Sequence, residues 1–120
     1  MTSNMTAVEK CQKINLIDLP VSNISFDIEK EEFNISLLIF QDEKQEYRNL
    51  ELKFLKIKNL MIGILNDYDM VEVASFNAKV VSEVVSFTFV FTLGFGKPSW
   101  KISFDAEDLT LSPMEIELWQ

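Results

Sequence analysis

The side chains of this chain that could do chemistry are mostly acidic, because histidine is absent. The 120 residues contain 19 Asp and Glu, 11 Lys and Arg, one Cys and no His. His is the side chain that changes its charge near neutral pH, and it is the commonest metal ligand. Its absence excludes Ser-His-Asp and Cys-His catalysis and most zinc sites. We therefore expect a protein that is not an enzyme and that holds no cofactor.

Two groups of acids could still carry chemistry. Asp105, Glu107 and Asp108 are close in sequence, and two carboxylates can flank and cleave a glycosidic bond. They fall at a predicted strand-to-strand turn, where acids are common because they are soluble. Asp67 and Asp69 lack the Gly and the closing Glu of a helix-loop-helix calcium site. We favour a structural role for both groups and predict no catalytic or metal-binding residue.

The other chemical signals also fit structure better than function. The GFG stretch Gly94–Gly96 is followed by Lys-Pro, so it lacks the ending of a phosphate-binding loop and is expected to be a hairpin loop. Lys53, Lys56 and Lys58 form a basic cluster that we expect to pair with acids of neighbouring strands. Cys11 is expected to be a small buried hydrophobe or an incidental thiol.

The formal net charge is −8, and it is shared unevenly between the two halves of the chain. The first 60 residues hold ten acids and eight bases, whereas the last 60 hold nine acids and three bases. A field of this sign repels nucleic acids and anionic membrane surfaces, and it speeds the encounter with basic molecules. A basic protein is therefore the expected partner, with no nucleic acid and no membrane.

Length and composition predict one globular domain over residues 1–120, with residues 1–10 as a loose N-terminal arm. No apolar run approaches the roughly 20 residues needed to cross a bilayer. The first ten residues lack the apolar stretch of a secretory signal. A lone Cys allows no internal disulfide and fits a reducing compartment. We expect a cytoplasmic protein.

Alternation of apolar and polar residues predicts short strands along most of the chain. The first half of the chain is predicted to hold an edge strand over 13–19 and a hairpin over 24–28 and 33–40. A run over 50–64 is predicted to bend near Leu55 or Asn59, as a bulge or a corner. Further strands are predicted to begin at Met70 and to cover 84–93, 100–104, 108–111 and 116–118. The polar stretch 41–49 is predicted to be a solvated loop. Val71, Val73 and Ser75 are expected to share one face, and a short helix over 78–85 is a further alternative.

The run from Phe87 to Leu93 carries no charge on either face. Edge strands usually carry charges that discourage pairing with other chains, so this run is expected to be a central strand. Its row of Phe side chains would form the spine of the core. The fold class predicted is all-β: an antiparallel sandwich or a partly open barrel of eight or nine strands, with at most one short helix.

The segment Val73–Leu111, with VASFNA, FTFVF, a Gly-containing loop and SWKISFDAEDLTL, resembles the closing hairpins of several small all-β bacterial families. Some of these families are uncharacterised, and others are immunity proteins that neutralise a toxin made by the same cell. The resemblance covers about a third of the chain and implies a partner-binding role. It transfers no functional residue.

The sequence thus predicts an acidic interaction module, of which an immunity-type inhibitor is one form. The expected partner-binding residues are Asp105, Glu107, Asp108, Glu115 and Glu117. One alternative is a binder of small apolar ligands whose internal cavity is lined by Phe and Met. Another is a structural homo-oligomer, joined through an exposed strand edge or through an apolar face at Leu38, Phe40 and Trp119.

Overall fold

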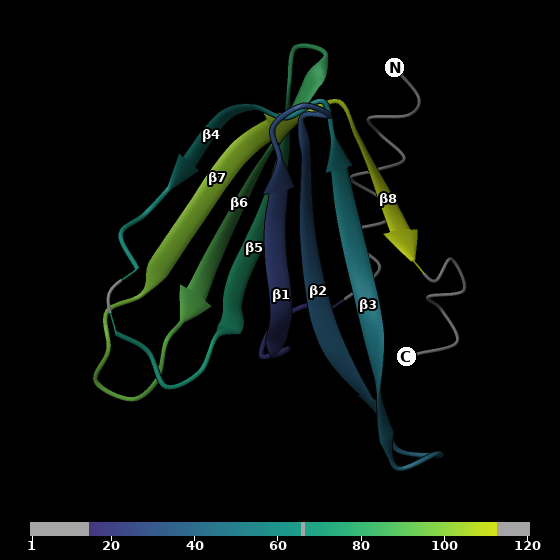
Figure 1. The fold of residues 1–120 in the computed structure, drawn as a ribbon, viewed down its shortest axis with the longest axis vertical. Coiled ribbons are helices and arrows are strands. Elements are labelled where there is room, and N and C mark those ends of the chain that lie inside the picture. Colours follow the sequence, from purple (N-terminus) through teal and green to yellow (C-terminus); the bar gives the residue numbers. More distant parts are fainter. Residues whose placement is uncertain (1–14, 66, 113–120) are drawn as a thin grey trace.

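The computed structural model describes residues 15–65 and 67–112, and within them the chain forms eight strands and no helix. The strands are β1 (Val21–Asp27), β2 (Glu32–Gln41), β3 (Glu46–Leu55), β4 (Lys58–Ile62), β5 (Glu72–Val81), β6 (Val84–Thr92), β7 (Trp100–Ala106) and β8 (Asp108–Ser112). They make two four-stranded antiparallel sheets, in the orders β1-β2-β3-β8 and β4-β7-β6-β5 (Figure 1). The all-β prediction is confirmed, and the architecture is a sandwich.

The chain passes between the sheets at two corners that lie side by side. β3 ends at Leu55 and β4 begins at Lys58, with Lys56 in the left-handed region at φ 57°. β7 leads into β8 through Glu107, whose N–H donates to the Leu55 carbonyl at 3.0 Å. The predicted bend is therefore a corner, and a bulge follows it because Asn59 also has a positive φ and the β4 register shifts there.

The predicted edge strand over 13–19 is wrong in its described part, because residues 15–19 form a turn before an isolated bridge at Pro20. Ile17 N–H donates to the Asn15 side chain at 3.1 Å, and Asp18 takes a φ of 70°. The turn still bonds to the second sheet, since Asp18 N–H reaches the Val73 carbonyl at 2.7 Å. Local Asn and Asp chemistry thus overrides the apolar pattern.

The uncharged Phe run is a central strand, as predicted. β6 lies between β5 and β7, and the side chains of Phe87, Phe89 and Phe91 are fully buried. β7 pairs with it as expected, with Phe91 opposite Trp100.

The two sheets are joined by interlocking aromatic rings. The ring of Phe54, from β3, lies 4.8 Å from both Phe87 and Phe104, and 6.0 Å from Phe89, measured between ring centroids. The contacts with Phe87 and Phe104 are edge-to-face, an arrangement that aromatic quadrupoles favour. Phe54 of one sheet is therefore inserted among the rings of the other.

The predicted loop over 41–49 is wrong, because β2 continues to Gln41 and β3 begins at Glu46. Only residues 42–45 form a turn, closed by a bond of 3.3 Å from Gln45 N–H to the Asp42 carbonyl. This hairpin extends past the end of the other strands (Figure 1). Both faces of the hairpin are exposed to solvent there, which accounts for its polar composition. The two strands nevertheless remain paired out to Gln41 and Glu46.

The helix considered over 78–85 is absent, because β5 runs to Val81 and a tight turn at Ser82, with φ 59°, leads into β6. The predicted faces of β5 are also wrong beyond Val73. The register shifts between Val73 and Ser75, so Phe76 points to the core, and its ring centroid lies 4.5 Å from that of Phe89 in a tilted contact. A bulge of this kind inserts one residue and reverses the alternation.

Several predictions fall outside the described residues. These are the N-terminal arm 1–10, the burial of Cys11 and the last strand over 116–118. The extent of one domain over 1–120 stays a prediction.

Replacing Phe54 by Ala should lower the free energy of unfolding by about 3–5 kcal/mol, because it removes a ring that contacts both sheets. Ile28→Ala is the control, since that side chain is 78% exposed, and it should change the value by less than about 0.5 kcal/mol. Urea unfolding followed by tryptophan fluorescence measures both. Equal losses would contradict the interlocked core.

Candidate interaction surfaces

Four connections gather at one end of the sandwich: the β1–β2 turn, the β3–β4 corner, the β5–β6 turn and the β7–β8 corner (Figure 1). Backbone bonds hold three of them together, since Ile57 N–H donates to the Glu31 carbonyl at 2.9 Å and Glu107 N–H to the Leu55 carbonyl. Exposed ion pairs add to this, with Lys58 at 3.7 Å from Glu31 and Lys56 at 3.6 Å from Glu107. Lys56 and Lys58 thus pair with acids of neighbouring segments, as predicted.

The predicted partner-binding residues divide into three groups in the structure. Asp105 is half-buried and accepts a 2.8 Å hydrogen bond from the Asn59 amide, while Glu107 is exposed and paired with Lys56. The Asp108 carboxylate accepts the N–H of Leu109 at 2.8 Å. Glu115 and Glu117 lie outside the described residues. The three described acids share the β7–β8 corner.

Asp108 belongs to a row of acids that crosses the first sheet. In the register, Asp27 lies opposite Glu32, Glu32 opposite Leu55, and Leu55 opposite Asp108. The next residues along β2, β3 and β8, which are Phe33, Phe54 and Leu109, are fully buried. Successive side chains of a strand point to opposite faces, so Asp27, Glu32 and Asp108 lie on the outer face. We call these three residues the acidic row.

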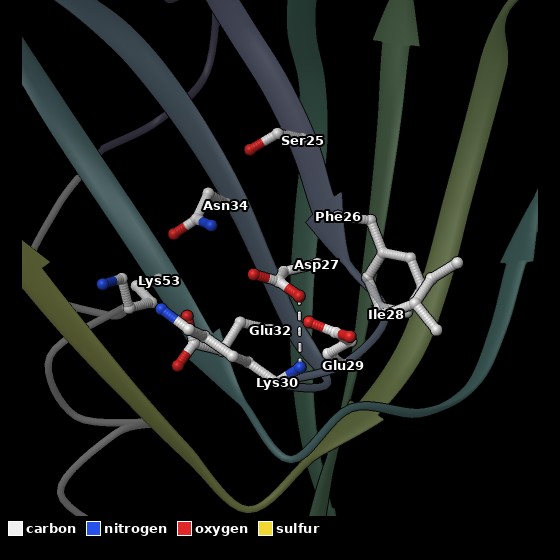
Figure 2. A pocket seen from close by; sticks show the side chains of 9 residues that line it. All are labelled: Ser25, Phe26, Asp27, Ile28, Glu29, Lys30, Glu32, Asn34 and Lys53. Carbon is white, nitrogen blue, oxygen red and sulfur yellow. Dashed lines mark hydrogen bonds between the residues drawn. The ribbon is translucent and has the colours of Figure 1, made fainter.

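An open hollow of about 580 Å³ lies over one end of the acidic row, beside the β1–β2 turn. It is lined by Ser25, Phe26, Asp27, Ile28, Glu29, Lys30, Glu32, Asn34 and Lys53 (Figure 2). Asp27 shapes the turn by accepting the Lys30 N–H at 3.1 Å. Sites for small apolar molecules are lined mainly by hydrophobic groups, so this mostly charged lining suits a polar or charged partner.

Asn34 stands in the next row of the same face, between Ser25 and Lys53. Its side-chain oxygen is buried, and no described group donates a hydrogen bond to it. A buried acceptor without a donor costs roughly 1–3 kcal/mol. The Asn34 oxygen is therefore an unsatisfied acceptor that lies beneath the lining of the hollow, out of contact with solvent.

Sequence reasoning missed Asp27, Glu32 and Asn34. Alternation placed Asp27 and Asn34 on the polar faces of their strands, and Glu32 fell just before the predicted start of its strand. Their position opposite one another depends on the register of the hairpin, and the turn at residues 28–31 has none of the Gly pairs that fix a register.

The opposite end of the second sheet carries exposed apolar side chains. The β4–β5 and β6–β7 loops bond to each other there, through Asp69 N–H to the Leu93 carbonyl at 2.9 Å and through Lys97 to Asp67 at 2.6 Å. Ile64 and Phe95 are 83% and 102% exposed. The large described apolar residues exposed at this end are Met61, Ile62, Ile64, Leu65, Tyr68, Met70 and Phe95.

The structure bears on both alternative functions. Met61 and Met70 are exposed, so neither lines an internal cavity. On the predicted apolar face, Leu38 is half-buried, Phe40 makes an edge-to-face contact with Tyr47 at 5.1 Å, and Trp119 lies outside the described residues.

Within residues 15–65 and 67–112, no group of three or more acidic, Cys or His side chains is placed to hold a metal ion. The same residues include no helix with the length and apolar character needed to cross a membrane. Comparisons with protein-family models, with curated proteins and with solved structures found no match to this chain.

Glu32→Gln should raise the free energy of unfolding by about 0.2–1 kcal/mol, because like charges directly opposite each other on an antiparallel pair are destabilising. Glu43→Gln, on the exposed β2–β3 turn, is the control and should change it less. Thermal unfolding at low salt measures both variants. A loss of stability in the Glu32 variant would contradict the repulsion between Asp27 and Glu32.

The hydrogen bond and the charge of Lys97 lower the pKa of Asp67 below 3.8. The small stabilisation from this exposed pair is therefore present at neutral pH and is lost as pH falls through the lowered pKa. Lys97→Met should raise the pKa of Asp67 towards 3.8. Carboxyl chemical shifts followed by NMR during an acid titration measure the change, and an unaltered pKa would contradict the pairing.

Proposed function

We propose that this chain is a non-catalytic protein-interaction module that binds a basic protein through its acid-bearing end. The binding surface is the acidic row, together with the hollow beside the β1–β2 turn and the neighbouring acids Asp105 and Glu107. The single observation that supports the proposal most is the register that sets Asp27, Glu32 and Asp108 across one exposed face.

Electrostatics favours a cationic partner at this surface. Asp27 and Glu32 face each other across adjacent strands, and such like-charged pairs cost stability in the free protein. Lys or Arg side chains of a partner would remove that repulsion and form charge-assisted hydrogen bonds with the carboxylates. Complementary charge of this kind increases the association rate more than the final affinity.

An Arg side chain suits this surface better than a Lys side chain. Its planar group has several N–H donors and can bind one carboxylate through two of them.

The specific form that we propose is an immunity-type inhibitor in the cytoplasm, which covers a basic surface of a toxin. The support for this form is the resemblance of Val73–Leu111 to families that include such proteins, together with the acidity of the chain. An inhibitor of this type needs a rigid surface more than it needs a reactive group, and the described acids lie on or beside paired strands.

The proposal is tested by capture of proteins from the source cell on the immobilised chain. The wild type is compared with the triple variant Asp27→Asn, Glu32→Gln, Asp108→Asn, whose amides keep the oxygen acceptors that Lys30 and Leu109 use. We expect the wild-type chain to capture a basic protein that moderate salt releases. The variant should capture at least about tenfold less of the same protein.

The matched control is the triple variant Asp42→Asn, Glu43→Gln, Glu46→Gln at the exposed tip of the β2–β3 hairpin. It removes the same number of charges from the other end of the sandwich, so it should retain the partner. Equal loss in both variants would show that net charge alone drives capture. The absence of any basic protein from the wild-type sample would count against the function itself.

A further inference from the structure

The outer edge of the second sheet, strand β4, is open. Among the described residues β4 pairs with β7 alone. Gly63 N–H donates to the Lys101 carbonyl of β7 at 2.8 Å. Backbone groups alternate in direction along an antiparallel strand, so Ile62, next to Gly63, directs its N–H and C=O groups away from the sheet. No strand of the described residues pairs with them, so another strand could do so.

The edge is guarded only at its start, where Lys58 opens β4 and the register shifts between Lys58 and Met61. Beyond that point residues 60–65 contain no charged side chain, whereas natural edges are commonly guarded by charges, especially Lys. The opposite edge, β5, differs because its start is covered by backbone bonds to the segment that precedes β1, and it carries Lys79 further along. The open edge at β4 is therefore specific to one side of the sheet.

Apolar side chains surround the same edge. Met61, Ile62 and Ile64 are 69%, 52% and 83% exposed, and Phe95 stands out from the adjoining loop. Together with the other exposed apolar residues of this end, these side chains expose an apolar surface on the order of 800 Å². This is about the area that each partner buries in a standard interface. A patch of this size is unusual on a soluble monomer.

We propose that β4 is a self-association edge, and that two copies of this chain pair their β4 strands antiparallel across a two-fold axis near Ile62. The two four-stranded sheets then join into one continuous sheet of eight strands. This inference is independent of the proposed function, because it uses the opposite end of the molecule from the acidic row.

A second copy fits this edge better than the basic partner does. β4 between Asn59 and Ile62 has no carboxylate to attract a cation, and the nearby charges of Asp67 and Lys97 are already paired at 2.6 Å. Two copies of a chain with a net charge of −8 repel each other, and this uncharged edge is where that repulsion is weakest. A two-fold axis places the same apolar patch on both sides of the interface.

The test is sedimentation equilibrium of the full chain over a wide range of concentrations. The wild type should form a dimer, and Ile62→Lys should raise the dimer dissociation constant by about a hundredfold or more, because the two-fold axis sets two lysines face to face. Ile28→Lys is the matched control, since Ile28 is 78% exposed on the β1–β2 turn, and it should leave the constant unchanged.

Ile64→Lys, which lies beyond the end of β4, keeps the test informative if Ile62→Lys loses its circular dichroism signal. High salt should leave the dimer intact, whereas it releases the basic partner. A wild-type monomer at every concentration would overturn the proposal. So would a dimer that neither lysine weakens, or a monomer whose β4 amides resist hydrogen exchange because another part of the chain covers them.

Discussion

The packing of the Phe54 ring against both Phe87 and Phe104 is the contact on which the rest of the structure depends. Phe54 is two residues before the corner at Lys56 and lies opposite Leu109, two residues after the corner at Glu107. The contact therefore joins the two sheets beside both places where the chain crosses between them. Its centroid distances of 4.8 Å leave the rings in direct contact. The sheets cannot separate there without exposing several fully buried Phe side chains to water.

The arrangement of the polar surface follows from this filled interior. Alternation along each strand sends every second side chain outward, and near the corners those side chains are Asp27, Glu32 and Asp108. Their carboxylates are therefore held by a ladder whose position the core determines. The molecule has two chemically different surfaces, an acid-bearing one at the corners and an exposed apolar patch at the far end of the second sheet, and each is suited to a different kind of partner.

The sequence predicted most strongly those features that depend on local pattern. The central place of β6 and its pairing with β7 were predicted because an uncharged Phe row suits a strand with neighbours on both sides. The bend after Leu55 was predicted because a change of phase requires a bulge or a corner. The extent of the β2–β3 hairpin, the bulge near Ala74 and the turn at Asp18 were missed. For the hairpin and the bulge, backbone hydrogen bonds with a neighbouring strand decide the conformation, and the residue types at the site do not reveal them. For the turn, the Asn15 side chain and the left-handed Asp18 override an apolar pattern that favours a strand.

The same distinction applies to the candidate site. Asp105, Glu107 and Asp108 could be found because they are close in sequence, whereas Asp27, Glu32 and Asn34 come near Asp108 only through the register of four strands. Register is specified by the buried face of a strand. The buried residues therefore decide which residues of the outer face become neighbours, and the types of the outer residues do not predict this.

Native-state hydrogen exchange measured residue by residue tests the central role of the Phe54 contact most directly. The amides of β6, and those of β3 near Phe54, should exchange only through global unfolding, with protection that equals the full free energy of unfolding. The tip of the β2–β3 hairpin should exchange much faster. Fast exchange in β6 or at Phe54, comparable with that of the hairpin tip, would contradict this central role.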